Sequence, residues 1–64
     1  MTTILDVLSL EIKKREHELV EFLGSGAIKE YAEYREICGV IRGLRTADSY
    51  LTDLVRKQER YEDE

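Results

Sequence analysis

Few residues of this chain carry the chemistry that catalysis or metal binding requires. His17 is its only histidine and Cys38 its only cysteine. His17 lies in a charged, polar stretch, which favours an exposed surface histidine over a general acid–base group or a metal ligand. Cys38 stands beside Ile37 and close to Ile41, which is typical of a small buried hydrophobe, whereas a reactive thiol needs an exposed, electropositive setting.

The remaining polar residues do not assemble into a site for chemistry. Catalysis needs a nucleophile with a base in reach, or paired carboxylates in a closed site. The Glu-x-x-His pairing of helical di-iron proteins is absent, because position 14 is lysine. One cysteine cannot form an intramolecular disulfide, and no His/Cys cluster offers a structural metal. We therefore predict no enzyme activity, no cofactor, no metal and no small-molecule substrate.

Length and charge restrict the class of protein further. The chain has 64 residues, 38% of them charged, and a net charge of −4. We expect one domain over residues 1–64, whose core at this size is marginal without oligomerisation or a partner surface. The negative charge argues against a nucleic-acid partner. The longest uncharged run, Phe22 to Ile28, is too short to span a bilayer, and the free cysteine suggests a reducing, intracellular origin.

The first half of the chain predicts a helix over about residues 3–23. Thr3 and Asp6 fit a capping box at its start. Apolar residues then recur at helical spacing: Leu5, Leu8, Ile12, Leu19 and Phe22. Gly24 is the expected left-handed residue after the helix, and residues 24–26 are the expected turn.

The second half predicts a longer helix over about residues 27–61, which is the main element of the chain. One face carries four apolar residues, Ile37, Ile41, Leu44 and Leu51. Gly39, Gly43 and Ala47 form a second stripe of small residues. Each glycine inside a helix costs about 1 kcal/mol relative to alanine. We therefore expect a close backbone approach there, either by the first helix or by a partner helix.

A short connection between two long helices predicts an all-α, antiparallel two-helix hairpin with a longer second helix, completed by oligomerisation or by docking on a partner. With the turn at Ser25, residues whose numbers sum to about 50 face each other, so that Leu5 lies opposite Leu44. On this alignment the first helix faces the second helix only as far as Ser49. Beyond it, a partner must cover Leu51 and its neighbours.

The predicted partner interface follows from this overhang, from the small residues and from the tyrosines. Tyrosine is enriched at the hot spots of interfaces, whereas the basic residues have acidic neighbours and are interpreted as a solvated surface. The interface residues are Tyr31, Tyr34, Gly39, Gly43, Tyr50, Leu51, Leu54 and Val55.

The stretch from Tyr31 to Leu44, YAEYREICGVIRGL, with a Gly/Ser turn before it, resembles a group of short tailed-phage proteins. The shared pattern is a tyrosine, an apolar-Cys-Gly step, Ile-Arg-Gly-Leu and an apolar and acidic helix end. Such proteins are typically encoded among the portal and head–tail structural genes. The resemblance implies a minor virion component, located in the virion or the host cytoplasm, and assigns no chemistry to any residue.

The sequence thus favours a non-enzymatic virion structural protein that docks on itself or on a larger phage protein such as a portal. Repetition around a ring would supply the missing apolar contacts. A second hypothesis is a free, dimeric, acidic adaptor or inhibitor of a host protein, built as a four-helix bundle. A third is an RNA-binding dimeric hairpin, which the net negative charge disfavours.

Overall fold

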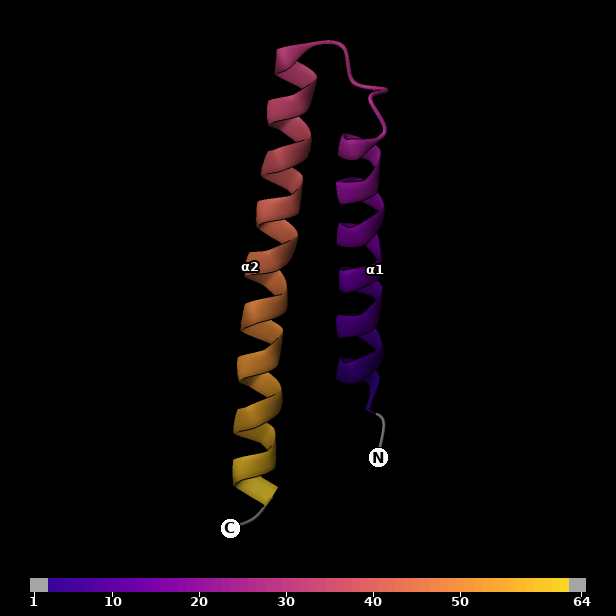
Figure 1. The fold of residues 1–64 in the computed structure, drawn as a ribbon. Coiled ribbons are helices and arrows are strands. Elements are labelled where there is room, and N and C mark those ends of the chain that lie inside the picture. The colour runs from indigo at the N-terminus through magenta and orange to yellow at the C-terminus, as the bar shows by residue number, and fades with distance from the viewer. Residues whose placement is uncertain (1–2, 63–64) are drawn as a thin grey trace.

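The computed structural model describes residues 3–62, with side chains described from residue 3 to residue 59, and it contains two helices. Helix α1 runs over Ile4–Gly24 and helix α2 over Tyr31–Glu62. They lie side by side and antiparallel, and α2 continues past the start of α1 (Figure 1). The predicted all-α hairpin with a longer second helix is confirmed.

The start of α1 has the predicted capping box. The backbone N–H of Asp6 donates to the Thr3 hydroxyl at 3.2 Å, and the backbone N–H of Thr3 donates to the Asp6 carboxylate at 3.0 Å. These two bonds satisfy N–H groups that have no partner inside the helix. The hydrogen bonds from the Thr3 backbone and hydroxyl lower the pKa of Asp6 below its ordinary value of 3.8.

The connection between the helices differs from the predicted turn. Gly24 is still helical, and Gly26 instead takes the left-handed conformation, with φ at +81°. The Ser25 hydroxyl donates to the carbonyl oxygen of Phe22 at 2.7 Å and accepts the N–H of Ala27 at 3.2 Å. These bonds close the end of α1, but they do not start α2, which begins at residue 31 rather than 27. The connection therefore spans residues 25–30 rather than 24–26.

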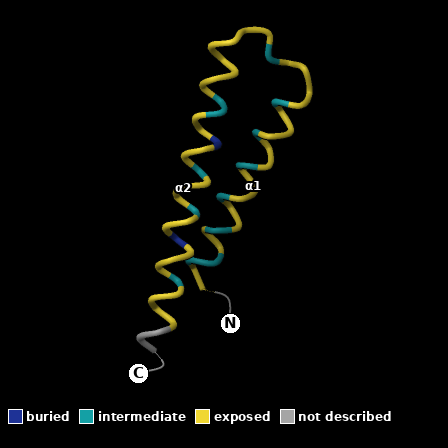
Figure 2. The backbone as a smooth tube through the Cα atoms, turned by 60° about the vertical axis from the view of Figure 1, so that its left-hand side comes forward, coloured by how far each residue is buried: buried dark blue, intermediate teal, exposed yellow. Residues whose placement is uncertain are grey.

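The two helices meet along a seam with alternating spacings of three and four residues, as in a coiled coil. Each seam residue is buried or half-buried, and these residues lie on the facing sides of the helices (Figure 2). In α1 they are Leu5, Ser9, Ile12, Glu16, Leu19 and Leu23. In α2 they are Ile37, Ile41, Leu44, Asp48, Leu51 and Val55. Leu8 and Phe22, predicted for this face, are exposed instead.

Polar contacts in the seam join the helices at defined positions. The Ser9 hydroxyl donates to the Asp48 carboxylate at 2.7 Å, and the ammonium of Lys13 lies 3.9 Å from the other oxygen of that carboxylate. The side chain of Asp48 is only 16% exposed. Glu16 lies one helical turn beyond Lys13 on α1, and it accepts a hydrogen bond from the guanidinium of Arg45 at 2.5 Å. Polar groups inside a seam specify its alignment, because a shifted pairing leaves them without partners.

These contacts correct the predicted alignment. The pairs 9–48 and 16–45 sum to 57 and 61, not to about 50. The longer connection moves the centre of the turn towards Ile28, and each residue of that movement shifts the facing partner by two. Leu51 consequently packs over the first turns of α1, and only 6% of it is exposed. The prediction that only another chain can cover Leu51 is wrong, and Val55 is half-buried as well.

The hairpin is one helix layer deep. Its Cα atoms span 53 × 18 × 12 Å, with a radius of gyration of 15.3 Å, against about 11 Å for a compact domain of this length. Among the described residues only Ile41 and Leu51 are buried hydrophobic residues. An isolated hairpin of this shape leaves most of its apolar side chains partly in water.

We predict that the neighbours Leu51 and Leu54 respond differently to truncation. Leu51→Ala should lower the free energy of unfolding of the single chain by about 2 kcal/mol or more, because Leu51 is buried against α1. Leu54→Ala should change it by less than about 0.5 kcal/mol, because 55% of Leu54 is exposed. Denaturant unfolding at low concentration, followed by circular dichroism, measures both. Equal losses would contradict the alignment.

We predict that acid weakens the start of α1. The pKa of Asp6 is lower in the folded chain than the ordinary value of 3.8. The contribution of Asp6 to stability is therefore complete above that ordinary value and is lost as the pH falls through the folded pKa. Amide NMR signals of Thr3 and Asp6, followed from about pH 5 to about pH 2, should report this fraying. The variant Asp6→Asn should show no such transition, and one persisting there would assign it to another group.

Candidate interaction surfaces

The predicted partner-interface residues do not form one surface in the folded chain. Leu51 and Val55 belong to the seam. Tyr31 and Tyr34 lie at the start of α2, on one side of the hairpin. Tyr50 and Leu54 lie on the opposite side, near the other end of α2. The predicted interface residues therefore lie in separate environments, and partner contact by the exposed ones stays a prediction.

One side of the hairpin carries an apolar face. It consists of exposed large side chains and one alanine: Ile4, Leu8 and Phe22 from α1, with Val40, Ala47, Tyr50 and Leu54 from α2. On α2 their spacing of three, four or seven residues places them along one edge of the helix, next to the seam. On α1, Ile4 and Leu8 are four residues apart, and Phe22 lies on the same edge fourteen residues further on. Phe22 also lines a shallow groove with Leu19 and Ile37 of the seam and with the charged residues Arg15 and Glu18. Isolated exposed apolar residues are ordinary, but the stripe along α2 indicates a contact surface, whereas on α1 Glu11, Arg15 and Glu18 separate Leu8 from Phe22.

The glycines of α2 do not receive the first helix. A Cβ atom added at Gly39 or at Gly43 would meet no atom within 4 Å, so neither glycine permits a close approach inside the hairpin. This branch of the prediction is wrong, and the approach of a partner helix at these glycines stays a prediction. Gly43 lies between Val40 and Ala47 on the apolar face, whereas Gly39 lies on the outer side of α2.

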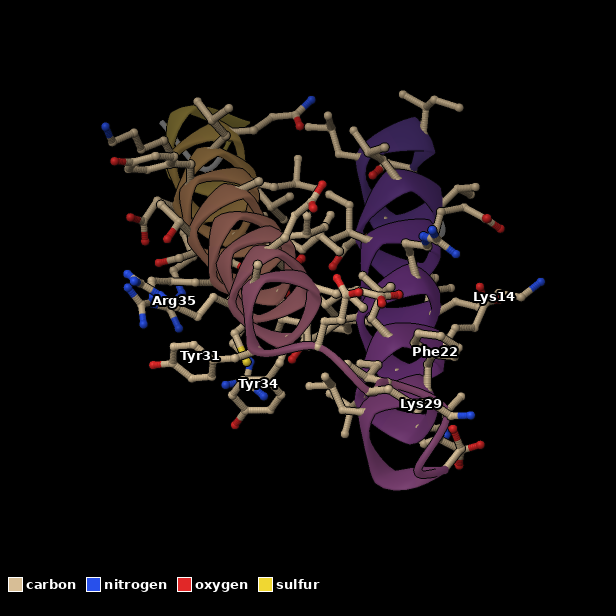
Figure 3. All side chains as sticks on the ribbon, turned by 90° about the horizontal axis from the view of Figure 1, so that it is seen from above. Lys14, Phe22, Lys29, Tyr31, Tyr34 and Arg35 are labelled. Carbon is tan, nitrogen blue, oxygen red and sulfur yellow. The ribbon has the colours of Figure 1, made fainter. Side chains whose placement is uncertain are left out.

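The other side of the hairpin carries what we name the tyrosine–arginine face. Its residues all come from the first half of α2: Tyr31, Tyr34, Arg35, Cys38, Arg42 and Arg45. Figure 3 shows Tyr31, Tyr34 and Arg35 projecting from the start of α2, with Lys14 on the far side of α1. The rings of Tyr31 and Tyr34 are stacked, with centroids 6.4 Å apart and an interplanar angle of 20°.

Cys38 connects two shallow grooves on this face. One groove, of 290 Å³, is lined by Val20 and Leu23 of α1, by Cys38 and Ile41, and at its edge by Arg42 and Arg45. The other, of 400 Å³, contains Tyr34, Arg35, Cys38, Gly39 and Arg42. A hydrogen bond with the thiol of Cys38 raises the pKa of the Tyr34 hydroxyl. The sequence predicts a buried thiol at Cys38, and in the structure this thiol is half-buried.

Groups that could support chemistry are sparse in the described part of the chain. His17 is exposed and lies 3.0 Å from the carboxylate of Glu21, one helical turn away. Within residues 3–59, no three His, Cys, Asp or Glu side chains gather as metal ligands would. Neither helix, over its described length, has a stretch long and apolar enough to cross a membrane.

Comparison with protein-family models, curated proteins and solved structures finds no match for this chain. The two faces are therefore interpreted from their own geometry and composition.

Sequence reasoning missed most members of these faces. The apolar spacing predicts Leu8 and Phe22 for the face between the helices, and it indicates no role for Val40 or Arg35. The spacing of residues 40, 43, 47, 50 and 54 was a usable signal, since it follows one edge of a helix. For the arginines, the signal was that Arg35 and Arg42 are seven residues apart, two helical turns on one side.

We predict opposite effects of alanine at two classes of glycine. Gly39→Ala and Gly43→Ala should each stabilise the single chain by up to about 1 kcal/mol, because helix propensity rises and nothing obstructs the new methyl group. Gly26→Ala should destabilise it by about 1 kcal/mol, because its φ is +81°. Thermal unfolding of the three variants measures this. Destabilisation by Gly39→Ala at low concentration would show that the outer side of α2 is already in close contact.

Proposed function

We propose that this protein is a non-enzymatic assembly protein, whose apolar face packs against the same face of a second copy. The observation that carries the proposal is the exposed apolar side chains of that face, which run from Val40 to Leu54 on α2 and continue on α1 at Ile4, Leu8 and, beyond a charged stretch, Phe22. A second hairpin has the same length and the same stripe. Two such layers, packed together, make a four-helix bundle with an enclosed core.

The exposed area supports a partner of this size. The chain has an accessible surface of 5499 Å², whereas a compact monomer of its mass exposes about 4,200 Å². The surplus of about 1,300 Å² exceeds the roughly 800 Å² that each partner buries in a standard interface. A second copy could cover enough of it for a stable contact. The small residues Gly43 and Ala47, in the middle of the face, would let the facing helices approach closely.

The setting that we propose is a tailed-phage particle. The chain would be a minor structural protein at the portal or head–tail region, where ring symmetry places a copy beside every other and a larger structural protein offers further surface. What supports this setting is the resemblance of residues 31–44 to short phage proteins. In this role the chain would work by docking, with no substrate.

A free dimeric adaptor or inhibitor of a host protein is the second candidate. One observation favours it: exposed carboxylates border the apolar face, at Glu11 and Glu18 of α1 and at Glu33 and Glu36 of α2. A four-helix bundle would display these carboxylates on its surface, where they could occupy a basic site. A discrete dimer that is stable without any phage protein supports the adaptor, and a chain that stably assembles only with portal-type proteins supports the virion component.

We predict that charges on the apolar face abolish self-association. In the double variant Val40→Glu/Leu54→Glu, packing would bury four carboxylates per dimer, which is prohibitive without partners. Both side chains are about half exposed, so the hairpin itself should keep its helicity. Sedimentation at several concentrations measures the assembly state. The control Lys14→Glu changes the net charge by the same two units on the outer side of α1, and it should associate normally.

Two results would contradict self-association through the apolar face. A double variant that sediments like the unmodified chain would show that the apolar face is not the contact. An unmodified chain that stays monomeric at every concentration, yet fully helical, would show that the hairpin needs no second copy.

A further inference from the structure

The tyrosine–arginine face carries positive charges, on Arg35 and Arg42, that no carboxylate of the described residues neutralises in an ion pair. Within residues 3–59, Arg45 pairs with Glu16, and neither Arg35 nor Arg42 forms an ion pair. The two acids in the first half of α2, Glu33 and Glu36, project from the other side of the helix, as their positions on the helical wheel require. An acidic chain thus concentrates free guanidinium groups on one side of one helix.

The same face has an apolar recess. Val20, Leu23, Cys38 and Ile41 line the 290 Å³ groove together with Arg42 and Arg45. A groove of this size accepts one leucine or phenylalanine side chain. The adjoining groove, which shares Cys38 and Arg42, is lined by Tyr34, and the exposed ring of Tyr31 stacks on that of Tyr34. Tyrosine and arginine around an apolar recess form the composition that interface hot spots favour.

We propose that the tyrosine–arginine face binds an acidic amphipathic segment of another protein. One large apolar side chain of that segment occupies the groove, and carboxylates beside it pair with Arg42 and Arg35. A guanidinium group presents a planar pair of N–H donors that matches a carboxylate. The contact does not involve the apolar face, so it is independent of self-association.

A protein segment fits this face better than a nucleic acid does. Besides Arg42 and Arg45, the groove is lined by aliphatic groups and a thiol, which suit an apolar side chain better than a polar base edge. The tyrosine rings already stack on each other, which occupies one face of each ring that a base would need. The net charge of −4 also repels a phosphate backbone outside the contact.

The test selects binders without assuming their sequence. The whole chain is immobilised, and a displayed library of short random helical peptides is selected against it. The selected peptides are then titrated, by fluorescence anisotropy, against the unmodified chain, against Arg35→Glu/Arg42→Glu and against the control Lys14→Glu/Lys57→Glu. The control reverses the same number of charges at exposed positions outside this face. A single-stranded oligothymidine is titrated in parallel.

The proposal expects peptides with aspartate or glutamate next to leucine or phenylalanine. It expects the arginine double variant to bind them about 100-fold more weakly, about tenfold for each arginine. The control should lose less than about threefold, through long-range charge alone. Binding should persist in Val40→Glu/Leu54→Glu, which separates this contact from self-association.

Four results would overturn the proposal. They are a selection that yields no binder, enrichment of neutral or basic peptides, equal losses in the arginine variant and the control, and tighter binding of oligothymidine than of any selected peptide. The last result would assign the face to nucleic acid. Circular dichroism of each variant checks that α2 remains helical, which is expected because glutamate and arginine have similar helix propensities.

Discussion

The alignment of the two helices depends on the carboxylate of Asp48. Its side chain is mostly enclosed in the seam, where an ionised group without hydrogen-bond donors is costly. Ser9 supplies a hydrogen-bond donor, and Lys13 an opposite charge, only in the observed alignment. A slip of one heptad in one direction would place Asp48 opposite Glu16, carboxylate against carboxylate, and in the other direction beyond the start of α1. The interior therefore accepts one alignment, at the expense of apolar contact.

Everything that the hairpin presents to its surroundings follows from this alignment. Because Asp48 faces Ser9, Leu51 packs over α1 while Leu54 remains at the edge. The seam residues of α2 fix its rotation, which places Val40 and Tyr50 on one side and Arg35 and Arg42 on the other. Charges and apolar groups that alternate along the sequence are thereby sorted into two faces of different chemistry. The seam is narrow, and most of the chain lies outside it.

Local rules account for the parts of the fold that were predictable from the sequence. The helical spacing, the capping box at Thr3 and the Gly/Ser interruption each depend on a few neighbouring residues, and the structure has all three. The alignment was not local. It depends on whether the connection has three residues or six, and no spacing within either helix reports that length. Ser9 and Asp48 were also overlooked, because a search for apolar stripes reads polar seam residues as interruptions.

The candidate surfaces were predictable only in part, for the same reason. Tyr31, Tyr34, Tyr50 and Leu54 are exposed, as a partner contact requires, since exposure of a large aromatic or leucine in a thin fold is easy to anticipate. Leu51 was misassigned because an error in alignment moves a residue from the overhang into the seam. Arg42 of α2 and Val20 of α1 line the same 290 Å³ groove. Predicting this needs the alignment of the two helices, which the sequence pattern alone does not contain.

A hairpin one helix layer deep has a calorimetric consequence. The heat capacity change of unfolding scales with the apolar surface that becomes exposed, and a chain with two buried hydrophobic residues between residues 3 and 59 exposes little of it. The stability of a single chain should thus vary gently with temperature, with a broad unfolding transition and a shallow dependence on denaturant. Once a second layer covers the apolar face, the same sequence should unfold over a narrow range with a much larger heat capacity change. The curvature of its stability with temperature then reports how many layers the protein has in a given state.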